Sequence, residues 1–69
     1  MPHVDISMIP GRDDKTKAEL AVKVQKFLSE ELKIDPAVVS VSVEDVEKEN
    51  WGEHMKRFKD ENMFVKPQF

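Results

Sequence analysis

Residues 38–46 read VVSVSVEDV, and the alternation of valine with polar residues in this stretch decides the fold. An extended chain here carries Val39, Val41 and Val43 on one side and Ser40, Ser42 and Glu44 on the other. Valine is β-branched and favours strands. The stretch therefore predicts a strand with one buried face and one polar face.

Residues 3–9, HVDISMI, predict a second strand of the same kind. The alternation places Val4, Ile6 and Met8 on one face, and His3, Asp5 and Ser7 on the other. Pro10 and Gly11 follow and interrupt the pattern, so the chain turns there.

Between the two strands, apolar residues recur at steps of three and four over residues 14–33, which predicts an amphipathic helix. Its apolar face consists of Leu20, Ala21, Val24, Phe27, Leu28 and Leu32. Asp13 is the expected N-cap, and Pro36 ends the helix near Lys33 because a proline disfavours helical geometry in the preceding residue. Strand, helix and strand in this order predict an α/β fold, a β-α-β unit with parallel strands and a right-handed crossover.

The size of the unit predicts self-association. A chain of 69 residues buries only about 60% of the surface that its unfolded form exposes. It contains no cysteine, and one helix covers only one face of a two-stranded sheet with both edges open. We expect a homo-oligomer in which two units form one larger sheet covered by helices. A dimer is preferred to a hexamer, because a trimer of dimers would bury the polar face of residues 40–44.

Residues 47–69 differ from this βαβ core of residues 2–46. Asn50 is expected to cap a short helix, with Glu53 three residues later. Trp51, Met55 and Phe58 then share one face of that helix. We expect a single domain over residues 1–69, in which residues 47–69 form a short helix and a C-terminal tail.

The composition excludes several classes of partner. The net charge is −3, from 11 basic and 14 acidic residues that are interspersed, which is unlike a nucleic-acid-binding face. No apolar stretch is long enough to cross a membrane, and the first fifteen residues contain no secretory signal, so a cytoplasmic protein is expected. We expect no metal site or phosphate loop, since the chain has two histidines far apart and two glycines. No Ser–His–Asp arrangement is predicted either.

Three short motifs, taken in order and with their spacing, resemble the tautomerase superfamily. They are PHVDI at residues 2–6, IPGRDD at residues 9–14 and ENWG at residues 49–52. The resemblance is to the small βαβ enzymes related to 4-oxalocrotonate tautomerase and covers roughly residues 2–52. The C-terminal part is more similar to the dimeric branch of the family, which ends in a helix.

The resemblance implies a cofactor-free isomerase that interconverts enol and keto acids. Pro2 matches the family's N-terminal proline, which becomes a general base once Met1 is removed and needs an amine that is neutral near pH 7. Arg12 matches the arginine that binds a substrate carboxylate. Trp51 stands where the family has an aromatic pocket wall. His54 is a further substrate-binding candidate, which could reach the site from the tail helix.

The sequence departs from the family at one position. The family's second arginine, which polarises the substrate's carbonyl, aligns with Ser40, a candidate substrate-binding residue. This departure disfavours the dicarboxylate 2-hydroxymuconate and favours a monocarboxylic enol such as phenylenolpyruvate. Lys56, Arg57 and Lys66 are possible substitute cations, and the sequence does not select among them.

Two alternatives remain open at this point. One is hydration-type dehalogenation of a 3-haloacrylate on the same site, with a protonated Pro2. The other is a non-enzymatic dimerising βαβ module whose site has decayed, as the loss of the second arginine would suggest. Retention of Met1 would leave the Pro2 nitrogen as an amide without basicity.

Overall fold

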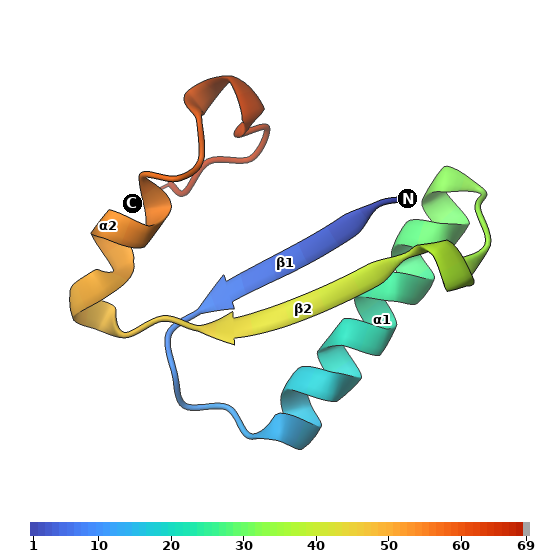
Figure 1. The fold of residues 1–69 in the computed structure, drawn as a ribbon, viewed down its shortest axis with the longest axis horizontal. Coiled ribbons are helices and arrows are strands. Elements are labelled where there is room, and N and C mark those ends of the chain that lie inside the picture. Colours follow the sequence, from blue (N-terminus) through green and yellow to red (C-terminus); the bar gives the residue numbers. More distant parts are fainter. Residues whose placement is uncertain (69) are drawn as a thin grey trace.

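The computed structural model describes residues 1–68 and has the predicted βαβ order (Figure 1). Its main elements are β1 (His3–Met8), α1 (Asp14–Leu32), β2 (Ser40–Asp45) and α2 (Trp51–Met55). Short 3₁₀ helices cover Pro36–Val38, Lys48–Asn50 and Asp60–Asn62. The first of these was not predicted: Asp35 caps it through the Ala37 amide at 2.9 Å, so that β2 begins only at Ser40.

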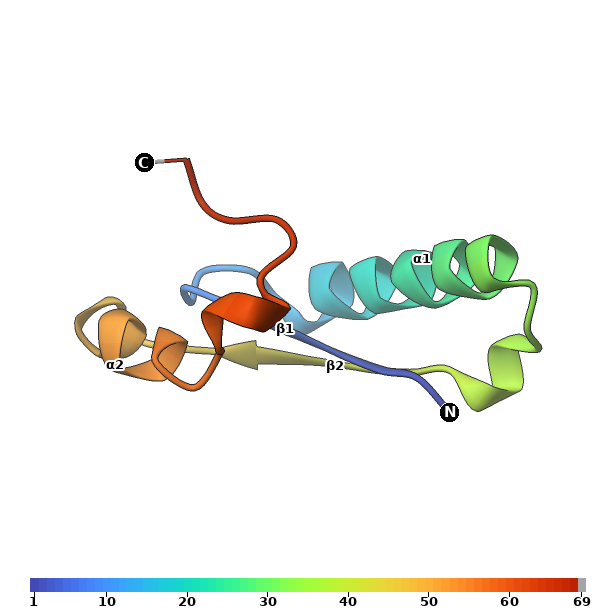
Figure 2. The same cartoon turned by 90° about the horizontal axis from the view of Figure 1, so that it is seen from above.

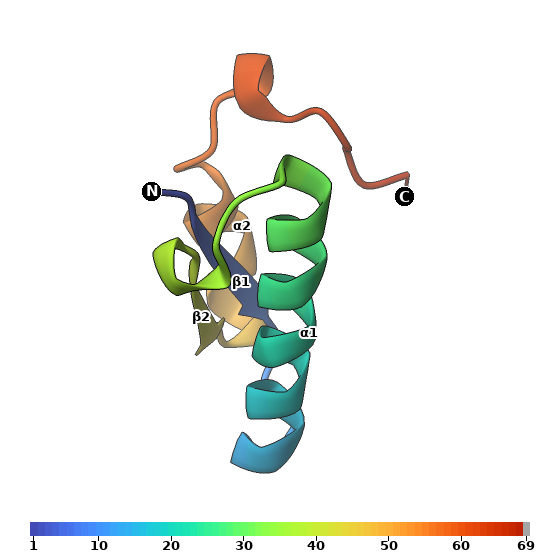
Figure 3. The same cartoon turned by 90° about the vertical axis from the view of Figure 1, so that its right-hand side faces the viewer.

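The two strands are parallel, as predicted. Val4 lies opposite Val41 and Ile6 lies opposite Val43, so the apolar sides of both strands form one face of the sheet. The other face carries the polar residues His3, Asp5, Ser7, Ser40, Ser42 and Glu44. Helix α1 runs along one face of the strands, and α2 lies beyond their C-terminal ends (Figures 2 and 3).

Asp13 caps α1, as predicted. Its Oδ1 accepts a hydrogen bond of 2.8 Å from the Thr16 amide, and its own backbone is extended. At the other end Lys33 adopts a left-handed conformation (φ 56°, ψ 49°), and the Ile34 amide donates to the Ser29 carbonyl. The helix is therefore closed at both ends by local hydrogen bonds.

The N-cap gives a testable expectation for stability. The hydrogen bonds from Thr16 hold the pKa of Asp13 below its usual value, so the carboxylate stabilises the fold above that pKa and the contribution is lost as the pH falls through it. Asp13→Ala should lower the melting temperature by roughly 5 °C at pH 7. At a pH low enough to protonate Asp13 in the folded protein, the two proteins should melt at closer temperatures; an equal gap at both pH values would contradict the role of the charge.

The predicted capping box at Asn50 is wrong. Asn50 has a near-helical backbone (φ −102°, ψ −2°) and makes no capping bond through its side chain, because a 3₁₀ helix already precedes α2. An N-cap requires an extended backbone at that residue. Glu53 instead forms an ion pair of 3.1 Å with Lys56.

The core of the single chain is thin. Val39 and Val46 are buried, and no large side chain among residues 1–68 is fully buried. Phe27 and Leu32, which the periodicity placed on the buried face of the helix, remain 65% and 52% exposed. These two residues would have to be covered by another copy of the chain to lie in a core. No helix within residues 1–68 is long and apolar enough to cross a membrane.

Candidate active site

Pro2 lies at the end of the sheet where both strands begin. It directly precedes β1, and its carbonyl accepts a hydrogen bond of 3.2 Å from the Ser40 amide. Its side chain is half-buried, whereas Met1 is 99% exposed. Strand pairing therefore fixes the backbone of Pro2 beside Ser40, at the edge of the polar face.

A chain of polar side chains starts at the same end. His3 Nδ1 lies 2.6 Å from Ser40 Oγ, and His3 Nε2 lies 3.0 Å from Ser42 Oγ. Ser42 Oγ donates in turn to Asp5 Oδ1 at 2.5 Å. The sequence predicted no Ser–His–Asp arrangement, yet the structure connects a serine, a histidine and an aspartate, with a second serine between the last two.

Asp5 is the negative end of this chain. A hydrogen bond from Glu44, together with the one from Ser42, lowers the pKa of Asp5, and the bond to Asp5 raises the pKa of Glu44. Asp5 therefore keeps its charge to lower pH than an ordinary aspartate, and Glu44 holds its proton to higher pH. The polar face carries a localised anion next to the histidine.

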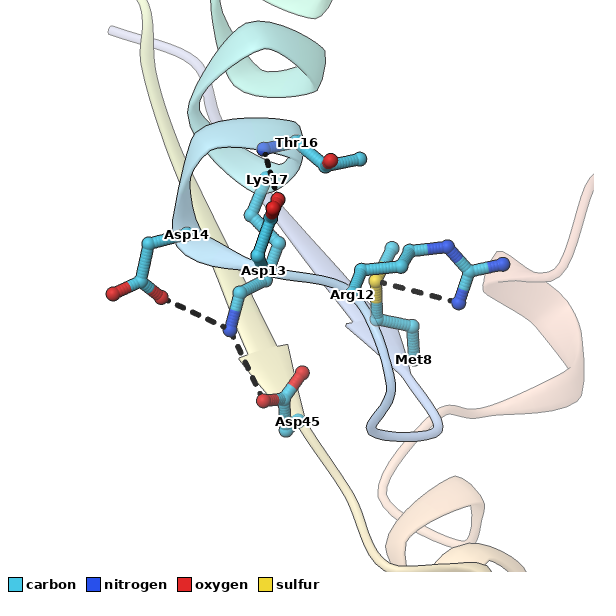
Figure 4. Close-up of polar contacts among 7 residues, drawn as sticks. All are labelled: Met8, Arg12, Asp13, Asp14, Thr16, Lys17 and Asp45. Carbon is cyan, nitrogen blue, oxygen red and sulfur yellow. Dashed lines mark hydrogen bonds and ion pairs between the residues drawn. The ribbon is translucent and has the colours of Figure 1, made fainter.

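Arg12 lies at the opposite end of β1, in the loop that leads to α1 (Figure 4). Its neighbours Asp13 and Asp14 are engaged elsewhere, by the Thr16 amide and by Lys17 at 3.5 Å. The guanidinium itself makes only a long contact of 3.9 Å with Met8 Sδ within residues 1–68. Arg12 is exposed and free to bind a carboxylate in the bidentate manner of its planar donors.

Trp51 and the rest of α2 lie at the same end as Arg12. They border a shallow groove of about 210 Å³ on the polar side of β1, lined by Asp5, Ser7, Trp51, Met55, Phe58 and Met63. The three residues Trp51, Met55 and Phe58 line this groove together, but only Trp51 and Met55 belong to α2, because the helix ends at Met55.

His54 fastens α2 to β1. Its Nε2 lies 2.7 Å from Ser7 Oγ, and its ring contacts Trp51 and Phe58 at centroid distances of 6.1 and 5.8 Å. Arg57 lies 3.4 Å from Nδ1, so this nitrogen acts as the acceptor and Nε2 donates to Ser7. His54 thus holds the tail helix at the groove.

Within one chain, the predicted site residues do not all lie close together. Both strands run from Pro2 towards Arg12 and Trp51, and the six residues of β1 separate the two ends by about 20 Å. Figure 1 shows the N-terminus and α2 at opposite ends of the sheet. Ser40 is the single predicted site residue that lies beside Pro2, and His54 lies with Trp51.

The possible substitute cations are all in the C-terminal segment. Lys56 pairs with Glu53, Lys66 lies 3.9 Å from Asp60, and Arg57 lies over the Phe58 ring at 5.9 Å. Within residues 1–68, no three His, Asp or Glu side chains are grouped so that they could hold a metal ion.

The comparisons with known proteins agree with the motifs. Residues 2–61 match the family model described as "Tautomerase enzyme". A 2-hydroxymuconate tautomerase of Comamonas testosteroni is 40% identical over 52 residues, which cover 75% of this chain and 82% of that protein. A probable tautomerase of Xylella fastidiosa is 37% identical over 51 residues, covering 74% of this chain but only 62% of the relative.

A solved structure shows the same fold. It comes from a characterisation of the 4-oxalocrotonate tautomerase isozymes of Methylibium petroleiphilum, with a TM-score of 0.68 and 35% identity over 74% of this chain and 82% of that one. The chain therefore belongs to the tautomerase enzyme family, and the predicted family and fold class are confirmed.

Proposed function

We propose that this protein is a tautomerase that converts the enol of a 2-keto acid, such as phenylenolpyruvate, into the keto form, with the Pro2 amine as general base. The proposal rests above all on the position of Pro2, which directly precedes β1 of a tautomerase-family chain and lies at the edge of the polar face. Met1 must be removed, because the nitrogen of Pro2 is otherwise an amide. The absence of a cofactor and the cytoplasmic location remain predictions.

The reaction needs only one proton carrier. The neutral amine of Pro2 takes the proton from the enol oxygen, and the electron pair of that O–H bond forms the C=O double bond. The π electrons of the former C=C bond then take a proton from the prolinium N–H to form the new C–H bond. The amine returns to its neutral form, so that no other reactant is consumed.

We infer that Arg12 and Trp51 reach Pro2 from a second copy of the chain. In a two-fold symmetric dimer with antiparallel β1 strands at the centre, the C-terminal end of one β1 lies beside the N-terminal end of the other. The partner's β1 strand then lies about 5 Å from the β1 strand that follows Pro2, and Arg12 of the partner subunit comes shortly after the end that is next to Pro2. Pairing through β2 would instead place four strands in the order β1–β2–β2–β1 and leave the partner's β1 about 15 Å away.

The apolar surface of α1 supports a dimer through β1. Val22 borders a groove together with Val41 of β2 and with Val39, which directly precedes β2, so that side of the helix faces β2. Phe27 lies 140° around the helix from Val22, since each residue turns it by about 100°. Phe27 therefore faces the β1 side, where its 65% exposed ring would meet the helix of the partner.

A charge at this position tests the dimer. Wild-type protein should have about twice the mass of the 8.0 kDa chain in light scattering, and Phe27→Glu should shift it to the monomer, because two carboxylates would face each other across the two-fold axis. Phe64→Glu is the matched control, since Phe64 is 91% exposed in the tail. A dimeric Phe27→Glu protein, or a wild-type hexamer, would contradict the proposed assembly.

The substrate preference follows from the absence of a cation at Ser40. Arg12 supplies one carboxylate site, and Trp51 offers a ring for an unsaturated or aromatic group. The expected result is a higher kcat/KM for phenylenolpyruvate than for 2-hydroxymuconate, the dicarboxylate after which the Comamonas relative is named. Ketonisation can be followed by the loss of enol absorbance, and a preference for the dicarboxylate would overturn this assignment.

A further inference from the structure

The hydroxyl of Ser40 is hydrogen-bonded to His3, and the protonation state of His3 decides whether that hydroxyl can donate to a substrate oxygen. Ser42 has one hydroxyl proton, and that proton is donated to Asp5 at 2.5 Å. The oxygen of Ser42 must therefore accept from His3 Nε2 at 3.0 Å, so Nε2 carries a hydrogen in both protonation states of the ring. Only Nδ1, 2.6 Å from Ser40 Oγ, changes when His3 ionises.

The two states of His3 give Ser40 opposite roles. When His3 is charged, Nδ1–H donates to Ser40 Oγ, and the hydroxyl proton of Ser40 is free to donate to a bound molecule. When His3 is neutral, Nδ1 accepts that proton, and Ser40 offers only lone pairs. As Pro2 removes the enol proton, negative charge develops on the substrate oxygen, and only the donating state of Ser40 stabilises it.

Several charged groups act on His3 in this place. Asp5 is connected to it through Ser42. Glu44 of β2 is hydrogen-bonded to Asp5, and the positive charge of Arg57, in the segment after α2, also acts on Asp5. The amine of Pro2 belongs to the residue that directly precedes His3 in the sequence. Hydrogen bonds from Glu44 and Ser42 lower the pKa of Asp5, which is the anionic end of this set of side chains.

We propose that Ser40 is a catalytic hydrogen-bond donor to the substrate oxygen and that His3 is the positioning residue that makes it a donor. This inference rests on the proposed tautomerase function. It assigns the binding of the substrate oxygen in the same site to the hydrogen-bonded side chains Ser40, His3, Ser42 and Asp5. It requires a charged His3 together with a neutral Pro2. The dependence of kcat/KM on pH is then bell-shaped, with an alkaline limb from His3 and an acid limb from Pro2.

The test is the pH profile of phenylenolpyruvate ketonisation by four proteins that carry a free Pro2. His3→Asn keeps an amide donor near Nδ1 but cannot ionise, so its alkaline limb should disappear. Ser40→Ala should lower kcat/KM about 10- to 100-fold at the optimum, whereas Ser40→Thr keeps a hydroxyl and should retain the limb. An unchanged bell in His3→Asn, or unchanged kcat/KM in Ser40→Ala, would overturn the proposal.

Two further variants separate this proposal from the proposed function. Thr16→Ala removes an exposed hydroxyl in the first turn of α1, outside the groove and the polar face, and should keep both limbs. Pro2→Ala tests the base. If turnover survives Pro2→Ala, the proposed function fails and the role of Ser40 in it fails as well. If turnover depends on Pro2 but the alkaline limb persists in His3→Asn, the base stands and the role of His3 is rejected.

Discussion

Replacing Pro2 with alanine should lower kcat/KM for ketonisation by about 10²- to 10⁴-fold and leave the fold unchanged. Alanine at this position keeps an amine but makes it primary and removes the rigid ring that fixes its direction. The backbone contribution of residue 2 is its carbonyl, which accepts from the Ser40 amide at 3.2 Å and is present in every amino acid. The loss should therefore be catalytic.

Circular dichroism and light scattering on the same Pro2→Ala sample provide the structural control. Both should match the wild type, because the side chain of residue 2 is only half-buried. The mass of each protein must first show that Met1 has been removed. A Pro2→Ala enzyme that turns over at the wild-type rate would exclude Pro2 as the base.

Replacing Arg12 with alanine should raise KM about 10- to 100-fold, with a smaller effect on kcat. Its guanidinium is exposed, with no carboxylate bonded to it within residues 1–68, so the substitution leaves no buried partner behind. Arg12→Lys keeps the charge but loses the planar pair of donors, and its KM should lie between those of the other two proteins.

Arg57→Ala is the matched control for Arg12, since it also removes an exposed arginine but in the C-terminal segment. Its KM should remain close to the wild-type value. An Arg12→Ala enzyme with unchanged KM would remove the proposed carboxylate site. An increase in KM for Arg57→Ala alone would move that site to the tail.

The fold was predictable because its signals are local. Alternation in residues 3–9 and 38–46 fixed which side of each strand is apolar, and the change to helical periodicity between them fixed the crossover. Asp13 was predictable as a cap because its role depends on residues three positions away. Asn50 was not, since the 3₁₀ helix before it changed its backbone.

The site was harder to predict because it depends on how separate segments meet. The contact of His3 with Ser40 and Ser42 follows from the register of the two strands, and a shift of one residue would have moved both serines to the other face. The separation of Pro2 from Arg12 could have been inferred, since Pro2 precedes β1 and Arg12 follows it. The surroundings of Phe27 could not be predicted from one sequence, because its exposed ring would be covered only by a second chain.

The most direct test of the central claim compares two forms of one sequence, one beginning with a free Pro2 and the other retaining Met1. Both should form the same dimer, because Met1 is 99% exposed. We expect the first form to ketonise phenylenolpyruvate far above the buffer rate and the second to show no more than the buffer rate. Equal rates would show that the amine of Pro2 is not the base, and no rate in either form would favour dehalogenation or a non-enzymatic module.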